Sequence, residues 1–283
     1  MKQQIQSDPA RMRELIAKLI PQANGDQAER FVRYYVMLIE RNNVMNLTAI
    51  TDPDGVAGRH FADSLVAAAE LAPGAKVLDV GTGAGFPGIP LLIMRPDLEL
   101  TLLDSLNKRI LFLNDVISEL GLSCRAIHSR AEDGGRSEEL RGQFDAVLTR
   151  AVAELSIAAE WTLPFAKTGG KSIMYKGPGA QEELGRAQNA LRILRAEARI
   201  VRFDLPWGER NLVIAEKIGP TPPKYPRKAG TASKNPLEQH RYRAGRTIKN
   251  AQHACKSKIH SRKGRQRKNA RRLRSARGER APW

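Results

Sequence analysis

The chain has few cysteines and no long apolar run, and each shortage excludes a class of protein. Cys124 and Cys255 are the only cysteines in 283 residues, which is too few for a disulfide framework, and their separation fits no zinc site. No stretch approaches the roughly 18 apolar residues of a membrane-spanning helix, and the N-terminus lacks the apolar core of a secretory signal. We therefore expect a cytoplasmic protein with no membrane contact.

The side-chain sets of nucleophilic and metal catalysis are also missing. Only five histidines occur, and they form no Ser/His/Asp or Cys/His arrangement with other residues in the sequence. No group of side chains has metal-ligand spacing. We expect neither a bound metal nor a covalent catalytic intermediate.

Positive charge is concentrated at the C-terminal end. The chain carries 47 Lys and Arg against 30 Asp and Glu, a net charge of +17. Residues 238–283 hold 16 of these basic and 2 of the acidic residues, so the other 237 residues are nearly neutral. A segment with so few apolar side chains should not pack alone, and we expect a disordered polybasic tail. Such a tail either binds RNA nonspecifically or is an inert extension past Leu237. Composition alone does not separate the two interpretations, and we slightly favour the second.

Hydrophobic periodicity divides the rest into a helical part and a strand–helix alternation. Helices are predicted over 9–22, 26–42 and 54–70, before a break at Pro73 and Gly74. Buried strands are predicted over 77–80, 99–103, 144–149, 171–176 and 211–217, with weaker ones over 124–128 and 198–203. The helices between them are predicted over 88–95, 106–120, 152–166 and 180–195. This alternation is typical of an α/β fold with a mainly parallel sheet covered on both faces.

Two features complete the expected organisation. The run 208–211 before the last strand predicts a hairpin, and hence an antiparallel partner at the edge of the sheet. We expect four parts: an N-terminal helical segment packed on the core, an α/β core, an extension rich in Pro and Lys, and the tail. Their ranges are 1–72, 73–218, 219–237 and 238–283.

A glycine-rich loop follows the first predicted strand and opens a helix. It reads Gly81-Thr82-Gly83-Ala84-Gly85-Phe86-Pro87-Gly88, and glycine lets a backbone turn tightly and approach a flat cofactor. Residues 83–88 match the dinucleotide-binding pattern G-x-G-x-x-G. A glycine-rich turn that binds no ligand is another interpretation. However, Asp79 just before the loop would repel a pyrophosphate and attract a cationic amine. The phasing Asp-x-Gly-x-Gly-x-Gly resembles motif I of class I S-adenosylmethionine-dependent methyltransferases.

Three further candidates follow later strands. Asp104 can accept hydrogen bonds from two ribose hydroxyls, or it can cap a helix, as Ser105 also can. Glu132, next to Ala131, is placed to read an adenine edge or is a solvated loop acid. Arg150 can hold a methionine carboxylate or a substrate phosphate, or it can form an ion pair with Glu154.

With these residues, the chain resembles the small-subunit ribosomal RNA guanine-N7 methyltransferase family, also called glucose-inhibited division protein B. The resemblance covers roughly residues 20–237, and Ala232 stands where the pattern usually has proline. The matching segments are 59–65, 79–90, 103–109, 149–151, 175–177, 208–210 and 225–237. The resemblance implies a Rossmann-like class I methyltransferase sheet and N7 methylation of one guanosine in a decoding-region loop of 16S rRNA.

The resemblance also implies which residues contact the cofactor, S-adenosylmethionine. They are Gly81, Phe86, Ala131, Glu132 and Arg150. The loop and strand-end argument adds Asp79, Gly83 and Asp104 to the predicted cofactor site. Phe86 is bulkier than the leucine of some members. We expect a monomer whose partner is the small ribosomal subunit.

Guanine N7 is a bare lone pair at neutral pH, so its methylation requires mainly positioning and no assigned catalytic residue. RNA contacts are expected from side chains near the carboxyl ends of the strands. The candidates are Arg59, His60, Lys108, Arg109, Lys171 and Lys176, although for His60 a packing or capping role is favoured. Two other functions stay open: a ribosome-assembly protein that keeps the fold without activity, and an NAD(P)-dependent oxidoreductase, which Asp79 disfavours.

Overall fold

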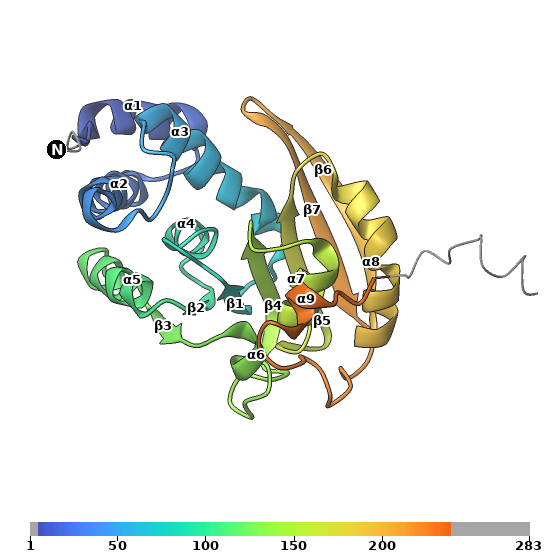
Figure 1. Cartoon of the computed structure of the whole chain (residues 1–283). Helices are drawn as coiled ribbons and strands as arrows, with labels where there is room; N and C mark the ends of the chain where they lie inside the picture. Colours follow the sequence, from blue (N-terminus) through green and yellow to red (C-terminus); the bar gives the residue numbers. More distant parts are fainter. Residues whose placement is uncertain (1–4, 239–283) are drawn as a thin grey trace, which may run out of the picture. The chain divides into compact units, whose positions relative to one another are not determined.

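A computed structural model of the chain describes residues 5–238, all within one compact unit. The predicted disordered tail, apart from its first residue, lies outside the described residues. Seven strands form one sheet in the order β3-β2-β1-β4-β5-β7-β6 (Figure 1). The strands are β1 (Lys76–Val80), β2 (Glu99–Asp104), β3 (Cys124–His128), β4 (Phe144–Arg150), β5 (Ala166–Lys176), β6 (Ala196–Leu205) and β7 (Gly208–Lys217).

The sheet is mainly parallel with an antiparallel end. Strands β1 to β5 pair in parallel with their neighbours, whereas β7 runs antiparallel to both β5 and β6. The hairpin between β6 and β7 turns at Pro206 and Trp207 and leaves β6 at the sheet edge. These pairings confirm the predicted α/β, Rossmann-like methyltransferase sheet and its antiparallel edge.

Helices cover both faces of the sheet, because alternate residues of each strand point to opposite sides. One face packs against α1 (Pro9–Leu19), α2 (Gly25–Met45), α4 (Gly88–Met94) and α5 (Asn107–Glu119). The other face packs against α7 (Leu155–Thr162) and α8 (Ala180–Leu194). Within β5, for example, Ile173 is buried on the first side and Met174 on the second. Figure 1 shows the two layers on either side of the strands.

Residues 53–70 are less regular than the single helix predicted over 54–70. They form α3 (Pro53–Gly55), the π-helical turn η1 (Val56–Ala62) and the 3-10 helix η2 (Leu65–Glu70). The amide of Asp63 donates to the carbonyl of Gly58, five residues earlier, which is the π-helical pattern. A Cβ on Gly58 would lie 3.0 Å from the Trp207 ring, so a close contact with the β6–β7 turn accompanies the irregular path.

The helix predicted over 152–166 is wrong at both ends. Ala151 has a φ of 56°, a left-handed conformation that no helix continues through, and α7 begins only at Leu155. At the other end β5 starts at Ala166, five residues before the predicted strand. The strand predicted over 124–128 is present with the same bounds as β3, and the other predicted helices and strands are present with shifted bounds.

The predicted irregular extension, 219–237, packs along the core. The guanidinium of Arg141 donates to the carbonyls of Thr221 and Tyr225, at 2.8 and 2.7 Å. Arg227 forms an ion pair at 2.6 Å with Glu160, which is buried. These contacts fix the segment before the short helix α9 (Thr231–Lys234), which was not predicted from the sequence.

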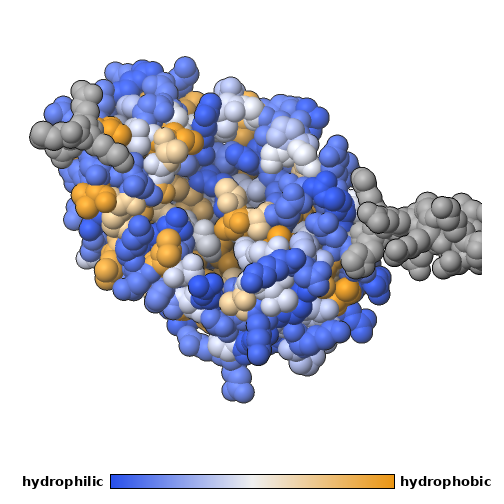
Figure 2. Space-filling model, viewed as in Figure 1, coloured by the Kyte–Doolittle hydropathy of each residue, from blue (hydrophilic) through white to orange (hydrophobic). Residues whose placement is uncertain are grey.

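The visible surface is polar for the most part. Figure 2 shows that hydrophilic side chains cover most of this face and that hydrophobic ones gather in patches toward its left and centre. Within residues 5–238, no helix combines the length and apolar character needed to span a bilayer.

Candidate functional site

A cavity of about 650 Å³ opens where β1, β2 and β4 end, in the size range of cofactor pockets. The loops that follow four parallel strands line it, together with residues 47–48, His60, Trp161, Gly230 before α9 and Ser233 within α9. Most of the predicted site residues are among its lining: His60, Gly81, Gly83, Phe86, Asp104, Arg109, Ala131, Glu132 and Arg150. The carboxyl edge of the sheet thus gathers residues from segments far apart in the sequence.

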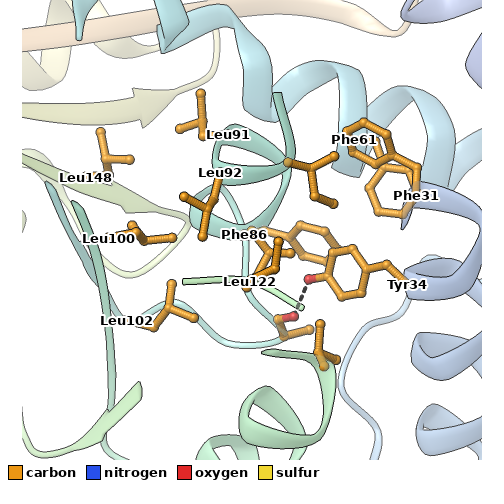
Figure 3. Packing of buried hydrophobic residues seen from close by; sticks show 14 of the residues in the cluster. Phe31, Tyr34, Phe61, Phe86, Leu91, Leu92, Leu100, Leu102, Leu122 and Leu148 are labelled. Atoms are coloured by element: carbon orange, nitrogen blue, oxygen red, sulfur yellow. Dashed lines mark hydrogen bonds between the residues drawn. The ribbon is translucent and has the colours of Figure 1, made fainter. Parts of the chain in front are cut away.

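The glycine loop needs its glycines for different physical reasons. Gly81, Gly83 and Gly85 have φ values of 70°, 64° and 107°, which side-chain-bearing residues rarely adopt. A Cβ on Gly85 would also lie 2.6 Å from the hydroxyl oxygen of Tyr34. That hydroxyl donates to the carbonyl of Ala84, and the Tyr34 ring packs in an aromatic cluster with Phe86 (Figure 3). Helix α2 therefore supports the loop through the side chain of Tyr34.

Asp79 lies beneath the loop and does not line the cavity. Its Oδ2 accepts hydrogen bonds from the Thr82 hydroxyl at 2.7 Å and from the Gly88 amide at 2.9 Å. Its Oδ1 is buried without a partner among the described residues. Burial raises the pKa of Asp79 to about 6. Within residues 5–238 the side chain shapes the loop, so direct contact with a cofactor, as predicted, is not supported by its position.

The raised pKa of Asp79 makes stability depend on pH. In the unfolded chain the group has a pKa near 3.9, so between about pH 4 and pH 6 the native state binds more protons than the unfolded state. The Asp79 contribution to stability must therefore fall as pH rises through this window. We expect the unfolding free energy of the wild type, minus that of Asp79→Asn, to fall by about 2–3 kcal/mol from pH 4 to pH 7. Urea unfolding at a series of pH values measures it, and a constant or rising difference contradicts the assignment.

Asp104 connects the second strand to the glycine loop. Its Oδ2 accepts from the Gly83 amide at 2.9 Å and its Oδ1 from the Leu106 amide at 2.9 Å. Arg109 lies 3.2 Å from the same carboxylate. The N-cap of α5 is Leu106, so neither Asp104 nor Ser105 is the cap that the alternative required. A carboxylate oxygen can accept two bonds, so the ribose role stays a prediction.

Arg150 forms its ion pair with a residue that the sequence analysis did not select. Its Nη1 lies 3.0 Å from Oδ2 of Asp63, which is fully buried. The Oδ1 of Asp63 accepts from Nε of Arg210 at 2.7 Å and from Nε1 of Trp207 at 3.3 Å. The alternative ion pair with Glu154 is wrong, because Glu154 pairs with an exposed arginine of α8. Asp63 thus joins β4, the β6–β7 hairpin and the π-helical turn at one point.

Phe86 packs against two other cavity residues. The His60 ring stacks on it with centroids 4.5 Å apart, and the Arg150 guanidinium carbon lies 5.2 Å from its centroid. Burial, reinforced by the Arg150 charge, lowers the pKa of His60 to about 3, so the imidazole is neutral near pH 7. The Nε2 atom of His60 is 2.8 Å from Oγ1 of Thr48. These contacts agree with the packing role favoured for His60.

Glu132 is buried, so the interpretation as a solvated loop acid is wrong. It belongs to α6 (Ala131–Gly134), and its Oε1 accepts from the Gly230 amide at 3.0 Å. Gly230 and Ser233 line the cavity beside Trp161 of α7. The indole Nε1 of Trp161 is buried and has no hydrogen-bond partner within the described part of the chain. The sequence analysis missed Trp161.

The family model of rRNA small subunit methyltransferase G matches residues 27–213. The chain belongs to this family. The Ribosomal RNA small subunit methyltransferase G of Clostridium perfringens (strain 13 / Type A) is 47% identical over 224 residues, covering 76% of this chain and 92% of the relative. That of Desulforamulus reducens is 48% identical over 219 residues, covering 75% and 91%. A solved methyltransferase from Pyrococcus furiosus matches with a TM-score of 0.48 and 16% identity, covering 69% of this chain and all of that one.

In this member of the methyltransferase G family, the predicted RNA-contact residues are dispersed. Arg59 and Lys108 are exposed, and Arg109 pairs with Asp104. Lys176 ends β5 at the carboxyl edge, where Glu183 lies 2.7 Å from its Nζ. Lys171 was expected near the carboxyl ends of the strands, and this is wrong. Lys171 pairs in register with Ala146, near the start of β4, and therefore lies at the amino ends of the strands, away from the cavity. The reason is that Lys171 is the first residue of the predicted apolar strand 171–176.

Arg130 was not predicted, yet it is exposed and lines the cavity of this methyltransferase. Asp63 and Arg210 lie within segments that carry the family resemblance, 59–65 and 208–210, but nothing in those segments alone indicates that they meet. Over residues 5–238, no group of three or more His, Cys, Asp or Glu side chains could hold a metal ion.

Proposed function

We propose that this chain uses S-adenosylmethionine to methylate N7 of a guanosine in a decoding-region loop of 16S rRNA. The observation that supports it best is the cavity at the carboxyl ends of the strands, lined by a glycine loop and, on the next strand, Asp104. Membership of the methyltransferase G family supports the ribosomal RNA substrate. The N7 position rests on the resemblance described in the sequence analysis.

The residues around the cavity suit this cofactor. Gly81 and Gly83 leave room for close approach, Asp104 is a carboxylate at the cavity wall on the ribose side, and Ala131 and Glu132 line the same cavity as Trp161 for the adenine. Arg150 is available for a carboxylate, because only some of its five N–H donors are used. The bound cofactor supplies an electrophilic methyl group.

The protein's part in the reaction is then to position and enclose the reactants. Guanine N7 carries a free lone pair at neutral pH, so no proton has to leave before it attacks. This agrees with the neutral His60, whose lowered pKa makes it a poor base. Phe86, His60 and Arg150 form a packed wall on one side of the cavity. Such a wall excludes water and fixes orientation, which is the main source of rate in a reaction of this kind.

Isothermal titration calorimetry with S-adenosylmethionine and, separately, with NAD distinguishes the two cofactor interpretations. We expect binding of S-adenosylmethionine and none of NAD. Methyl transfer to 16S rRNA in vitro then distinguishes an enzyme from an RNA-binding protein that has lost activity. Binding of NAD alone, or cofactor binding without any methyl transfer, would contradict the proposal.

Trp161 provides a prediction about cofactor affinity. The residue lines the cavity, its buried Nε1 has no described partner, and we expect cofactor binding to turn the indole so that this N–H donates to an adenine nitrogen. The variant Trp161→Phe should therefore bind S-adenosylmethionine about 5–10-fold more weakly, since one hydrogen bond contributes about 1 kcal/mol. Removal of an unsatisfied donor stabilises the cofactor-free protein, whereas the smaller ring leaves a void that destabilises it, so the melting temperature should change little. Equal affinity in calorimetry would contradict this role.

A further inference from the structure

Thr48 is fixed at the wall of the cavity by three hydrogen bonds. It lies in the loop after α2, and its amide donates to Oδ1 of Asn42 at 2.9 Å. The Ile50 amide donates to the Thr48 hydroxyl oxygen at 3.0 Å. The same oxygen lies 2.8 Å from Nε2 of His60. A short polar side chain is thus held in one orientation at the edge of a pocket, although the cofactor site described above does not use it.

The surroundings of His60 determine where its proton lies. The ring is neutral, so one nitrogen donates and the other accepts. Nη2 of Arg150 lies 3.5 Å from Nδ1, the long limit of a hydrogen bond, and a guanidinium can only donate, which favours Nδ1 as the acceptor. The ring proton is therefore on Nε2 and points at the Thr48 oxygen. That oxygen now accepts from both His60 and Ile50, so its two lone pairs are occupied and its own hydrogen remains available.

Thr48 and the adenine-side residues approach the cavity from different layers of the fold. Thr48 and His60 belong to the N-terminal helical layer, which packs on one face of the sheet. Glu132 and Trp161 belong to α6 and α7, and α7 packs on the other face. A cofactor whose adenine lies beside α6 and α7 leaves the Thr48 side for the base that receives the methyl group.

We propose that the Thr48 hydroxyl donates a hydrogen bond to O6 of the target guanine and so selects guanine over adenine. This inference rests on the proposed N7 methylation. Guanine presents the acceptors O6 and N7 on the edge that must face the methyl donor, whereas adenine presents an amino donor in place of O6. A hydroxyl whose lone pairs are both occupied cannot accept from that amino group. Thr48 is therefore a positioning and specificity residue that leaves N7 free to react.

The experiment compares the wild type with Thr48→Val, Thr48→Ser and the loop control Ala49→Ser, an exposed neighbour. The full chain is assayed on 16S rRNA carrying either guanine or 2-aminopurine, which lacks O6, at the target position. For the wild type we expect 2-aminopurine to lower kcat/KM about 10–100-fold, the usual size of one base contact. On guanine, the kcat/KM of Thr48→Val should be lower than that of the wild type by the same factor. On 2-aminopurine the two enzymes should have equal kcat/KM, because the contact with O6 is already absent. Thr48→Ser should recover most of that loss, and Ala49→Ser should match the wild type.

Calorimetry with S-adenosylmethionine separates this role from cofactor binding, and Thr48→Val should bind it as the wild type does. An active wild type that uses both bases equally overturns the inference without any variant. So does a Thr48→Val enzyme that keeps its kcat/KM on guanine or loses cofactor affinity by the same factor. A wild type that methylates no N7 in 16S rRNA contradicts the proposed function instead, and the inference falls with it.

Discussion

Replacement of Asp63 by asparagine should lower the free energy of unfolding by about 3–5 kcal/mol, the usual cost of removing one partner from a buried ion pair. The Asp63 carboxylate is fully buried between Arg150 and Arg210, and the neutral amide would leave both guanidinium groups without a counter-charge. Because Arg150 lies against Phe86 in the cavity, methyl transfer should be lost together with stability. Urea unfolding and a methyl-transfer assay measure the two effects.

The matched control is Glu154→Gln, which removes a carboxylate from the exposed ion pair with Arg186. Solvent screens such pairs, so the urea midpoint of this variant should equal that of the wild type. If Asp63→Asn unfolds at the same urea concentration as the control, the Asp63 cluster does not hold the three segments together.

Gly85→Ala should be the most damaging single change in the glycine loop. Its φ of 107° disfavours any side chain, and the new methyl group would lie 2.6 Å from both the Tyr34 hydroxyl and Cγ1 of Ile89. Overpacking of this kind costs about 1–3 kcal/mol, and the left-handed backbone adds about 1 kcal/mol. Because the loop lines the cavity, we also expect affinity for S-adenosylmethionine to fall at least tenfold. Denaturant unfolding and calorimetry check the two values.

Gly121→Ala separates backbone strain from steric overlap. Gly121 follows α5 with a φ of 59°, and an added Cβ would meet nothing within 4 Å. This control should lose only the strain energy, about 1 kcal/mol, and should bind the cofactor normally. Equal losses of stability in both glycine variants would show that the contact with Tyr34 is unimportant.

Much of the sheet was predictable because buried parallel strands are continuous apolar runs bounded by turns. β3, although only half-buried, was predicted with its observed bounds. Local patterns failed where tertiary contacts decide the path. The helix over 54–70 was wrong because residues 56–62 form a π-helical turn in which Gly58 packs close to Trp207, and the apolar pattern of a short segment does not reveal such a contact. Helices α6 and α9 span four residues each, which is too short for a periodicity to appear.

Some residues of the candidate site could be predicted from the sequence and others could not. Gly81, Asp104 and Arg150 could be predicted because they follow or end parallel strands, and such positions converge at one edge of a sheet. Thr48 and Trp161 could not, because they reach the cavity from helices and loops of other layers. Asp63 could not either, because it does not line the cavity and acts through its ion pair with Arg150. The sequence also could not show that Asp79 lies beneath the loop. Its position two residues before Gly81 is compatible with a side chain that points into the cavity and with one that bonds to Thr82, as observed.

Mass mapping of 16S rRNA from a strain that lacks this protein decides whether the chain methylates guanine N7. We expect N7-methylguanosine in the decoding-region loop of the parent strain and an unmodified guanosine at the same position in the deletion strain. A plasmid that carries the wild-type chain should restore the methyl group, and one that carries Asp63→Asn should not. An unchanged level of N7-methylguanosine in the deletion strain would contradict the account.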